Sequence, residues 1–147
     1  MKTMIIAGAL ALVSFTSVKA NNNSSSNKVG YNTSQSFQRQ FGQVQNVSWS
    51  PAANRMMRAT FTSEGEVVNA FFGNDGEFIG STIDRSINDL PSKLRETIRE
   101  KSKGAEVLEI VEFQGDAEHA YFVKVRNGSS EKILKGYGNG YLRETSL

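Results

Sequence analysis

The feature that most constrains the fold is a pair of similar halves. Each half has one helical segment, residues 34–41 or 89–103, followed by segments in which hydrophobic residues alternate with period two. The alternating segments are residues 45–50, 55–63, 66–73 and 77–84, then 106–113, 119–126, 131–137 and 141–145. Four turn dipeptides that favour tight hairpins occur between them: Glu64-Gly65, Asp75-Gly76, Asn127-Gly128 and Asn139-Gly140. The sequence therefore predicts an α+β fold with one helix and four antiparallel strands in each half.

Two matches at one offset support an internal duplication. Residues 57–61 align with residues 121–125 at a spacing of 64, and the same spacing superimposes residues 75–78 on residues 139–142. A repeated spacing of this kind indicates repeated structural units. We therefore expect one domain over residues 32–147, with halves at about 32–86 and 87–147.

The first helical segment has an amphipathic pattern. Phe37 and Phe41 lie one turn apart, Thr33 or Ser34 is a candidate N-cap, and Gly42 follows the last helical residue. One face of this helix is therefore expected to pack against the sheet.

The second helical segment repeats the pattern. Leu90, Leu94 and Ile98 form one apolar stripe, Asp89 is a candidate cap, and Gly104 ends the helix. We expect this stripe to share one core with Phe37 and Phe61. The many charged residues between the apolar positions are typical of a solvated helix face.

The sheet should have one face under the helices and one open face. Alternation in the second strand directs Ala59 and Phe61 to the helices and Arg58 to the other face. The internal repeat extends this to the sixth strand and places Lys124 and Arg126 on the open face. Arg58, Lys124 and Arg126 are the candidate partner-binding residues. A solvated sheet face without a binding role is the competing and simpler interpretation.

The first twenty residues have the pattern of a signal peptide. Lys2 precedes an apolar run over residues 4–13, and Val18-Lys19-Ala20 is a small-x-small cleavage sequence. The run is shorter than the ~20 residues that a bilayer requires. We expect export to the periplasm with cleavage after Ala20, a flexible polar tether over residues 21–31, and no membrane segment in the mature chain.

The charge balance does not favour nucleic-acid binding. The chain has 17 basic and 15 acidic residues, and removal of residues 1–20 takes away Lys2 and Lys19 but no acid. A mature chain with 15 residues of each sign has no net field that attracts nucleic acid.

Few residues could carry chemistry. The chain has no cysteine and one histidine, His119, which lies outside any catalytic or zinc-binding spacing. Residues 73–77 resemble a calcium loop but lack its alternating oxygen ligands, so a hairpin turn is the better interpretation. The pairs Glu64/Glu66 and Glu109/Glu112 flank turns or alternate on strands. We therefore predict no catalytic, metal-binding or cofactor-binding residue, and no enzymatic activity.

Several motifs over residues 34–145 together resemble one family. They are Phe37-x-x-x-Phe41, Asn46-Val47-Ser48-Trp49, Arg58-Ala59-Thr60-Phe61, residues 65–72, Asp75-Gly76 and Asp89-Leu90-Pro91-x-x-Leu94-x-x-x-Ile98. This combination resembles the β-lactamase-inhibitor-like, PepSY-like family of exported bacterial proteins, found chiefly in Bacteroidetes. The resemblance implies that both helices lie on one face of a continuous eight-stranded antiparallel sheet, as in β-lactamase inhibitor proteins.

Two functions follow as hypotheses. The first is a non-enzymatic periplasmic module that presents the open sheet face to an unidentified protein partner, whether or not it inhibits that partner. The second is an accessory protein that binds a small ligand or an envelope component.

Overall fold

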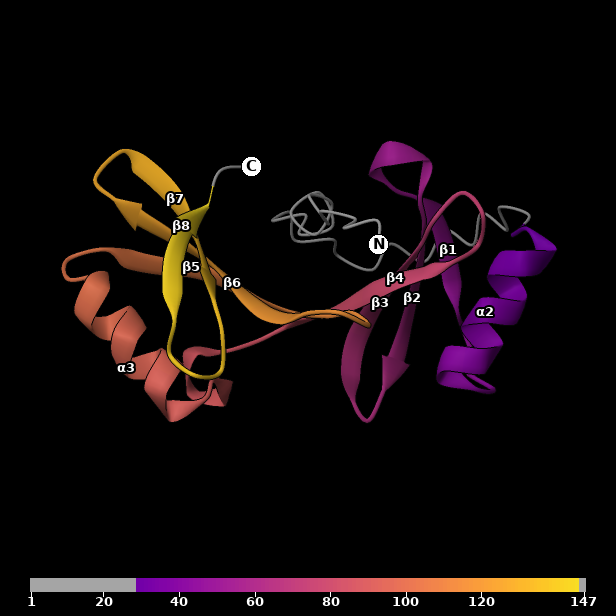
Figure 1. Ribbon diagram of the computed structural model, residues 1–147, viewed down its shortest axis with the longest axis horizontal. Helices are drawn as coiled ribbons and strands as arrows, with labels where there is room; N and C mark the ends of the chain where they lie inside the picture. The colour runs from indigo at the N-terminus through magenta and orange to yellow at the C-terminus, as the bar shows by residue number, and fades with distance from the viewer. Residues whose placement is uncertain (1–28, 146–147) are drawn as a thin grey trace, which may run out of the picture.

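The computed structural model describes residues 29–145, which form two helices and one sheet. The expected signal peptide and most of the expected tether lie outside these residues. In chain order the elements are α2 (Tyr31–Phe41), β1 (Ser48–Pro51), β2 (Met57–Ser63), β3 (Glu66–Phe72), β4 (Phe78–Asp84), α3 (Ser92–Lys101), β5 (Glu106–Gln114), β6 (His119–Asn127), β7 (Ser130–Gly136) and β8 (Leu142–Thr145). Figure 1 shows β1 to β4 with α2 in one half of an elongated molecule and β5 to β8 with α3 in the other.

The eight strands form one continuous antiparallel sheet in the order β1 to β8, which confirms the predicted fold class. The halves join where β4 pairs with β5, at Ile83 opposite Glu112. The register continues from Val68 on β3 through these two residues to Tyr121 on β6. These residues share one face of the sheet, which is the face that both helices cover.

Each helix covers its own half. Phe37 of α2 packs with Phe61 and Phe72, and the ring centroids of Phe37 and Phe61 are 5.3 Å apart. Leu94 and Ile98 of α3 pack in a separate cluster that includes Val123 and Val125. The expectation that Phe37, Phe61, Leu94 and Ile98 share one core is therefore wrong. The helices stand over different strands, and charged side chains occupy the sheet face between them.

The helices begin at other residues than the sequence suggested. Helix α2 begins at Tyr31, inside the expected tether, with Gly30 at the N-cap position and Thr33 buried. Asp89 does not cap α3 but closes a preceding 3-10 turn, where its carboxylate accepts a hydrogen bond from the Ser86 amide. The residue before α3 is Pro91, whose ring fixes the backbone angle φ near −65° and thus preorganises the first turn.

The hairpin turns follow the predicted dipeptides, with one shift. Asn127 is the last residue of β6, so Gly128 and Ser129 make that turn. The segment that resembled a calcium loop is a turn, in which the Gly73 amide donates to the Glu77 carbonyl. At Gly76, with φ of +88°, a Cβ atom would lie 2.8 Å from the Thr33 backbone nitrogen. This glycine therefore allows α2 to touch the β3–β4 turn.

Within residues 29–145, no helix has the length and apolar character needed to cross a membrane.

Candidate functional site: the open face of the sheet

The open face is the sheet surface opposite α2 and α3. One row of paired residues crosses it from β4 to β8, in the order Asp84, Val111, Phe122, Lys135 and Arg143. These residues alternate with those that contact the helices, as the strand periodicity requires. The face therefore has an apolar centre with charged residues toward both ends.

The centre of this face is a buried apolar cluster rather than a solvated surface. Its members are Met56, Phe71, Val111, Phe113, Ala120, Phe122 and Ile133. Phe122 is 0% exposed and Phe113 is 2% exposed. The expectation of a solvated sheet face is thus wrong in the middle of the sheet. The sequence signal was the unbroken apolar run over residues 120–123, which is typical of a strand buried on both sides.

The predicted residues Arg58, Lys124 and Arg126 share the open face but not one location. Arg58 lies on β2, where its Nε donates to Ser50 Oγ at 3.1 Å. Lys124 and Arg126 lie on β6, in the other half, and both form ion pairs with Glu131, at 2.8 and 2.6 Å. Hydrogen bonds from both cations hold the pKa of Glu131 below its ordinary value. Lys124 and Arg126 therefore face an acidic neighbour within the chain.

An ion pair between a buried lysine and a half-buried glutamate lies at the C-terminal end of the face. Lys135 is only 6% exposed, and its Nζ lies 2.6 Å from Glu118 Oε1. The Tyr137 hydroxyl donates to the same oxygen at 2.9 Å. Burial raises the pKa of Glu118, but the hydrogen bonds from Lys135 and Tyr137 outweigh it, so the pKa lies below its ordinary value. No local sequence pattern indicates this pair, because its members lie 17 positions apart and meet only through strand pairing.

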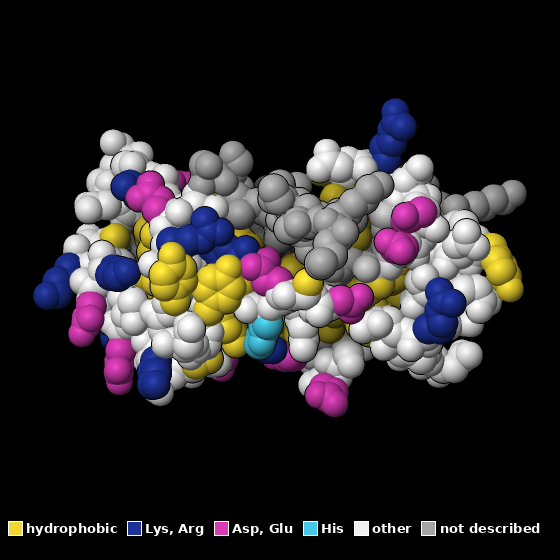
Figure 2. Space-filling model, viewed as in Figure 1, with side chains coloured by type: hydrophobic (Ala, Val, Ile, Leu, Met, Phe, Trp, Pro, Cys, Tyr) yellow, Lys and Arg dark blue, Asp and Glu magenta, His cyan; other side chains and the backbone are white. Residues whose placement is uncertain are grey.

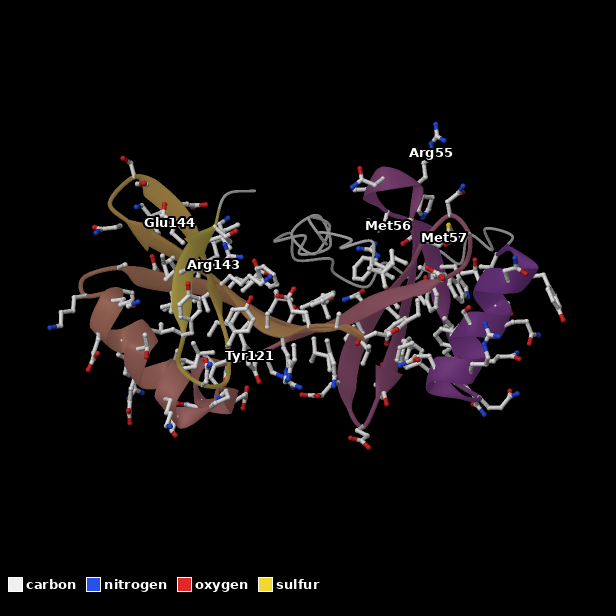
Figure 3. The ribbon with its side chains drawn as sticks, in the orientation of Figure 1. Arg55, Met56, Met57, Tyr121, Arg143 and Glu144 are labelled. Atoms are coloured by element: carbon white, nitrogen blue, oxygen red, sulfur yellow. The ribbon has the colours of Figure 1, made fainter. Side chains whose placement is uncertain are left out.

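Two tyrosines and an arginine stand beside this ion pair. Tyr137 and Tyr141 face each other across the β7–β8 hairpin with ring centroids 6.1 Å apart, and Tyr141 is 57% exposed. Arg143 is exposed on β8 (Figure 3). In Figure 2, hydrophobic and basic side chains lie side by side over the same half of the molecule. Sequence reasoning missed this group because it assigned Tyr137 only to the predicted strand 131–137 and the other two residues only to the predicted strand 141–145.

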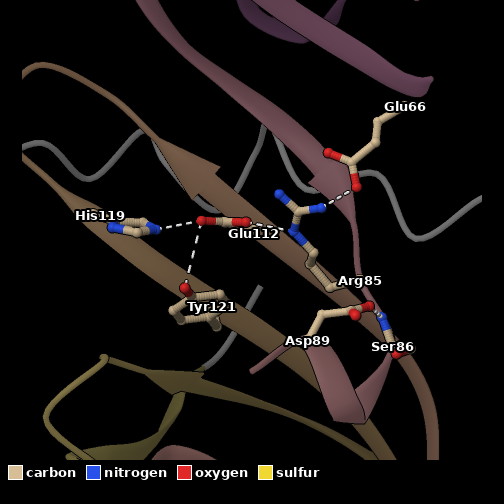
Figure 4. A network of polar contacts seen from close by, with 7 residues as sticks. All are labelled: Glu66, Arg85, Ser86, Asp89, Glu112, His119 and Tyr121. Atoms are coloured by element: carbon tan, nitrogen blue, oxygen red, sulfur yellow. Dashed lines mark hydrogen bonds and ion pairs between the residues drawn. The ribbon is translucent and has the colours of Figure 1, made fainter. Parts of the chain in front are cut away.

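The opposite face carries a polar network between the two helices (Figure 4). Arg85 pairs with Glu66 on β3 and with Glu112 on β5, the latter through Nε and Oε2 at 2.5 Å. His119 Nε2 lies 2.5 Å from Glu112 Oε1. The Tyr121 hydroxyl donates to the same oxygen at 3.4 Å. The network joins the two halves where neither helix covers the sheet.

This network converges on one carboxylate. Glu112 is in hydrogen-bond contact with three side chains, those of Arg85, His119 and Tyr121. Burial alone would raise the pKa of Glu112, but hydrogen bonds from Arg85 and His119 lower it below the ordinary value. Among residues 29–145, no buried side-chain nitrogen or oxygen lacks a hydrogen-bond partner.

Solved structures share this arrangement of helices and sheet. A BLIP-like protein from Bacteroides fragilis superimposes with a TM-score of 0.70 at 16% identity, over 79% of this chain and 84% of that chain. The fold is BLIP-like. A DUF2874 family protein from Bacteroides uniformis matches with a TM-score of 0.70 at 13% identity, over 79% of this chain and 89% of that one. These matches confirm the predicted fold and its resemblance to β-lactamase inhibitor proteins.

A third structure, a candidate periplasmic protein from Bacteroides eggerthii, has a TM-score of 0.69 at 12% identity, over 80% of this chain and 88% of that chain. No protein-family model matches the sequence, and a search of curated proteins found no significant match. The likeness to known proteins therefore lies in the fold.

Proposed function

We propose that the chain is a non-enzymatic periplasmic binding module that presents the open face of its sheet to a protein partner. The observation that carries this proposal is the composition of that face. Buried aromatic side chains support exposed tyrosine and charged residues there, and neither helix covers them. Aromatic and arginine residues around an apolar centre are typical of protein interfaces.

The fold supports the same proposal. One protein of this fold carries the description BLIP-like and another the description of a candidate periplasmic protein. A periplasmic location would also agree with the signal-peptide pattern of residues 1–20. The buried side-chain polar groups of the described residues all have hydrogen-bond partners, which favours recognition at a surface over chemistry in a pocket.

Arg58, Lys124 and Arg126 would act at the edges of the interface. Lys124 and Arg126 already pair with Glu131, so they would change the rate of encounter with a charged partner more than the strength of the complex. Their effect should fall as salt rises, because the screening length is about 8 Å at physiological ionic strength.

Photo-crosslinking tests which face binds. A photoreactive amino acid would replace Val67, which is 56% exposed on the open face, or Arg99, which is exposed on α3. Each mature variant would be added to a periplasmic extract of its own organism. We expect one protein to crosslink from position 67 and not from position 99. Crosslinking from position 99 alone, or none from either, would refute the proposal.

Two further measurements complete the test. Reversal of Arg58, Lys124 and Arg126 to glutamate should slow association with the crosslinked partner at low salt. The matched control reverses Lys93, Arg99 and Lys103, which are exposed on or just after α3.

Native mass spectrometry of the purified chain tests the alternative function, in which the chain binds a small ligand or an envelope component. A small molecule that stays bound, together with no crosslinked protein, would support a ligand-binding or envelope-binding accessory protein instead.

A further inference from the structure

We propose that Tyr137, Tyr141 and Arg143, at the β7–β8 end of the open face, form its main partner contact, and that they bind a protein segment in which a carboxylate lies next to an apolar side chain. This inference rests on the proposed function, because it names the partner chemistry of the same face. We call these three residues the Tyr–Arg patch.

The two tyrosines are held in place by the chain's own hydrogen bonds. The Tyr137 amide donates to the Tyr141 carbonyl at 3.0 Å, and the Gly140 amide donates to the Tyr137 carbonyl at 2.9 Å. Asn139 Oδ1 accepts a hydrogen bond from the Tyr141 amide at 3.0 Å. A turn with this many internal bonds has little freedom left to lose on binding, which favours affinity.

The side chain of Tyr137 is held in place by contacts with Glu118 and Lys135. Its hydroxyl bonds to Glu118, and Lys135 Nζ lies 5.8 Å from its ring centroid and 5.3 Å from that of Phe122. Because Lys135 also pairs with Glu118, its charge is compensated within the chain. Lys135 therefore supports the patch and leaves the recognition of a partner's charge to another residue.

Arg143 is that residue. It is exposed and lies opposite Lys135 in the strand register. Its charge contributes to the lowered pKa of Glu118, but Lys135 and Tyr137 hold that carboxylate by direct hydrogen bonds, which leaves the exposed guanidinium of Arg143 able to bind a second carboxylate. Tyr141, two positions earlier, lies on the same face of the sheet. A guanidinium can bind a carboxylate through two parallel hydrogen bonds, and a neighbouring aromatic ring can pack against an apolar group. Lys124 and Arg126 are less suited to this role because each already pairs with Glu131.

A random peptide library displayed on phage tests the inference while the natural partner is still unidentified. The immobilised mature chain would be used to select binding peptides, which are then sequenced and measured as free peptides. We expect selected peptides to be enriched in Asp or Glu beside an aromatic or aliphatic residue. Arg143→Glu should weaken their binding about tenfold or more, and Tyr141→Ala should do the same.

Three controls separate this role from a loss of fold. Arg99→Glu makes the same charge change on α3 and should leave binding within about twofold. Tyr141→Phe keeps the ring and should retain most of the affinity. Arg143→Lys keeps the charge but loses the two-bond geometry, so it should fall between wild type and Arg143→Glu. Each variant is compared with wild type by circular dichroism and urea denaturation.

Several results would overturn the inference. These are an absence of selected peptides, selected peptides without acidic residues, or equal binding by wild type and Arg143→Glu. Binding of soluble peptidoglycan fragments that Tyr141→Ala removes and Arg143→Glu leaves unchanged would also do so. The proposed function is judged separately by crosslinking from position 67, so it can stand when the Tyr–Arg patch fails.

Discussion

Arg85 and Glu112 link the two halves of the molecule through a hydrogen-bonded ion pair, in which Arg85 Nε lies 2.5 Å from Glu112 Oε2. Arg85 follows β4, the last strand of the first half, and Glu112 lies on β5, the first strand of the second. Their side chains are 19% and 15% exposed, so solvent screens the pair only in part. The pair occupies the helix-side surface that neither α2 nor α3 covers.

Glu112→Gln should destabilise the protein at neutral pH. The pKa of Glu112 lies below its ordinary value of 4.5, because hydrogen bonds from Arg85 and His119 outweigh the opposing effect of burial. A carboxyl group with a lowered folded-state pKa stabilises the fold above pH 4.5, and this stabilisation is lost as the pH falls through the folded value. We expect the free energy of unfolding at pH 7 to fall by about 1–3 kcal/mol.

Urea denaturation of wild type and Glu112→Gln over a pH series measures this effect. The difference between the two proteins should shrink as the pH falls below 4.5. Glu100→Gln on the exposed surface of α3 is the control and should match wild type throughout. A Glu112→Gln deficit that stays constant down to pH 3 would show that the carboxylate charge is not its cause.

Ile98→Ala should lower the free energy of unfolding by about 2–5 kcal/mol. Ile98 is 1% exposed and packs beneath α3, so its loss leaves a cavity as well as removing buried apolar surface. Glu100→Ala on the same helix is exposed and should change stability by less than about 0.5 kcal/mol. Equal urea midpoints for the two variants would mean that the apolar stripe of α3 does not contact the sheet.

Gly76→Ala should be more destabilising than Gly65→Ala. Both glycines have positive φ angles, +88° and +85°, so alanine is strained at either position. At Gly76 a Cβ atom would also lie 2.8 Å from the Thr33 backbone nitrogen, whereas Gly65 has nothing within 4 Å. The difference in thermal unfolding between the two variants therefore measures the contact of α2 with the β3–β4 turn. Identical melting temperatures would contradict this contact.

Export with cleavage after Ala20 stays a prediction, because residues 1–28 lie outside the described structure. N-terminal sequencing of the protein from the periplasm should begin at Asn21. Replacement of Ala20 by a bulky residue should block processing and serves as the control. Recovery of the whole chain, starting at Met1, from the cytoplasm would refute the prediction.

The strand segments, the hairpins and the presence of one helix in each half could be predicted from local patterns, whereas the continuous eight-stranded sheet followed from the family resemblance. Hydrophobic alternation and turn dipeptides lie within a few residues of one another, and the repeat at a spacing of 64 fixes which strands correspond. Ala59 and Val123 accordingly face the helices, as expected. The first residue of each helix was harder to predict, because the two candidate caps have other roles. Thr33 is buried, and Asp89 accepts a hydrogen bond in the turn before α3.

The side-chain clusters could not be predicted from local patterns. Glu118 and Lys135 meet only because β6 and β7 pair in one particular register, and Arg85 reaches Glu66 across two strands. The strand register likewise brings the charge of Arg143 close enough to Glu118 to lower the pKa of that carboxyl. The sequence therefore predicted basic residues on the open face. It did not indicate which of them form ion pairs with acidic residues of the same chain.

The order of strands in the sheet also bears on how the chain folds. Each strand hydrogen-bonds only to strands adjacent in sequence, and among the described residues only the β4–β5 pairing has an α-helix between its members. A low sequence separation between paired residues reduces the entropy lost in loop closure and is associated with rapid folding. Residues 31–84 contain every strand partner that the first half needs except β5. That half can therefore complete its internal pairings while the second half is still unfolded, and β4 then offers a formed edge on which β5 to β8 add in turn.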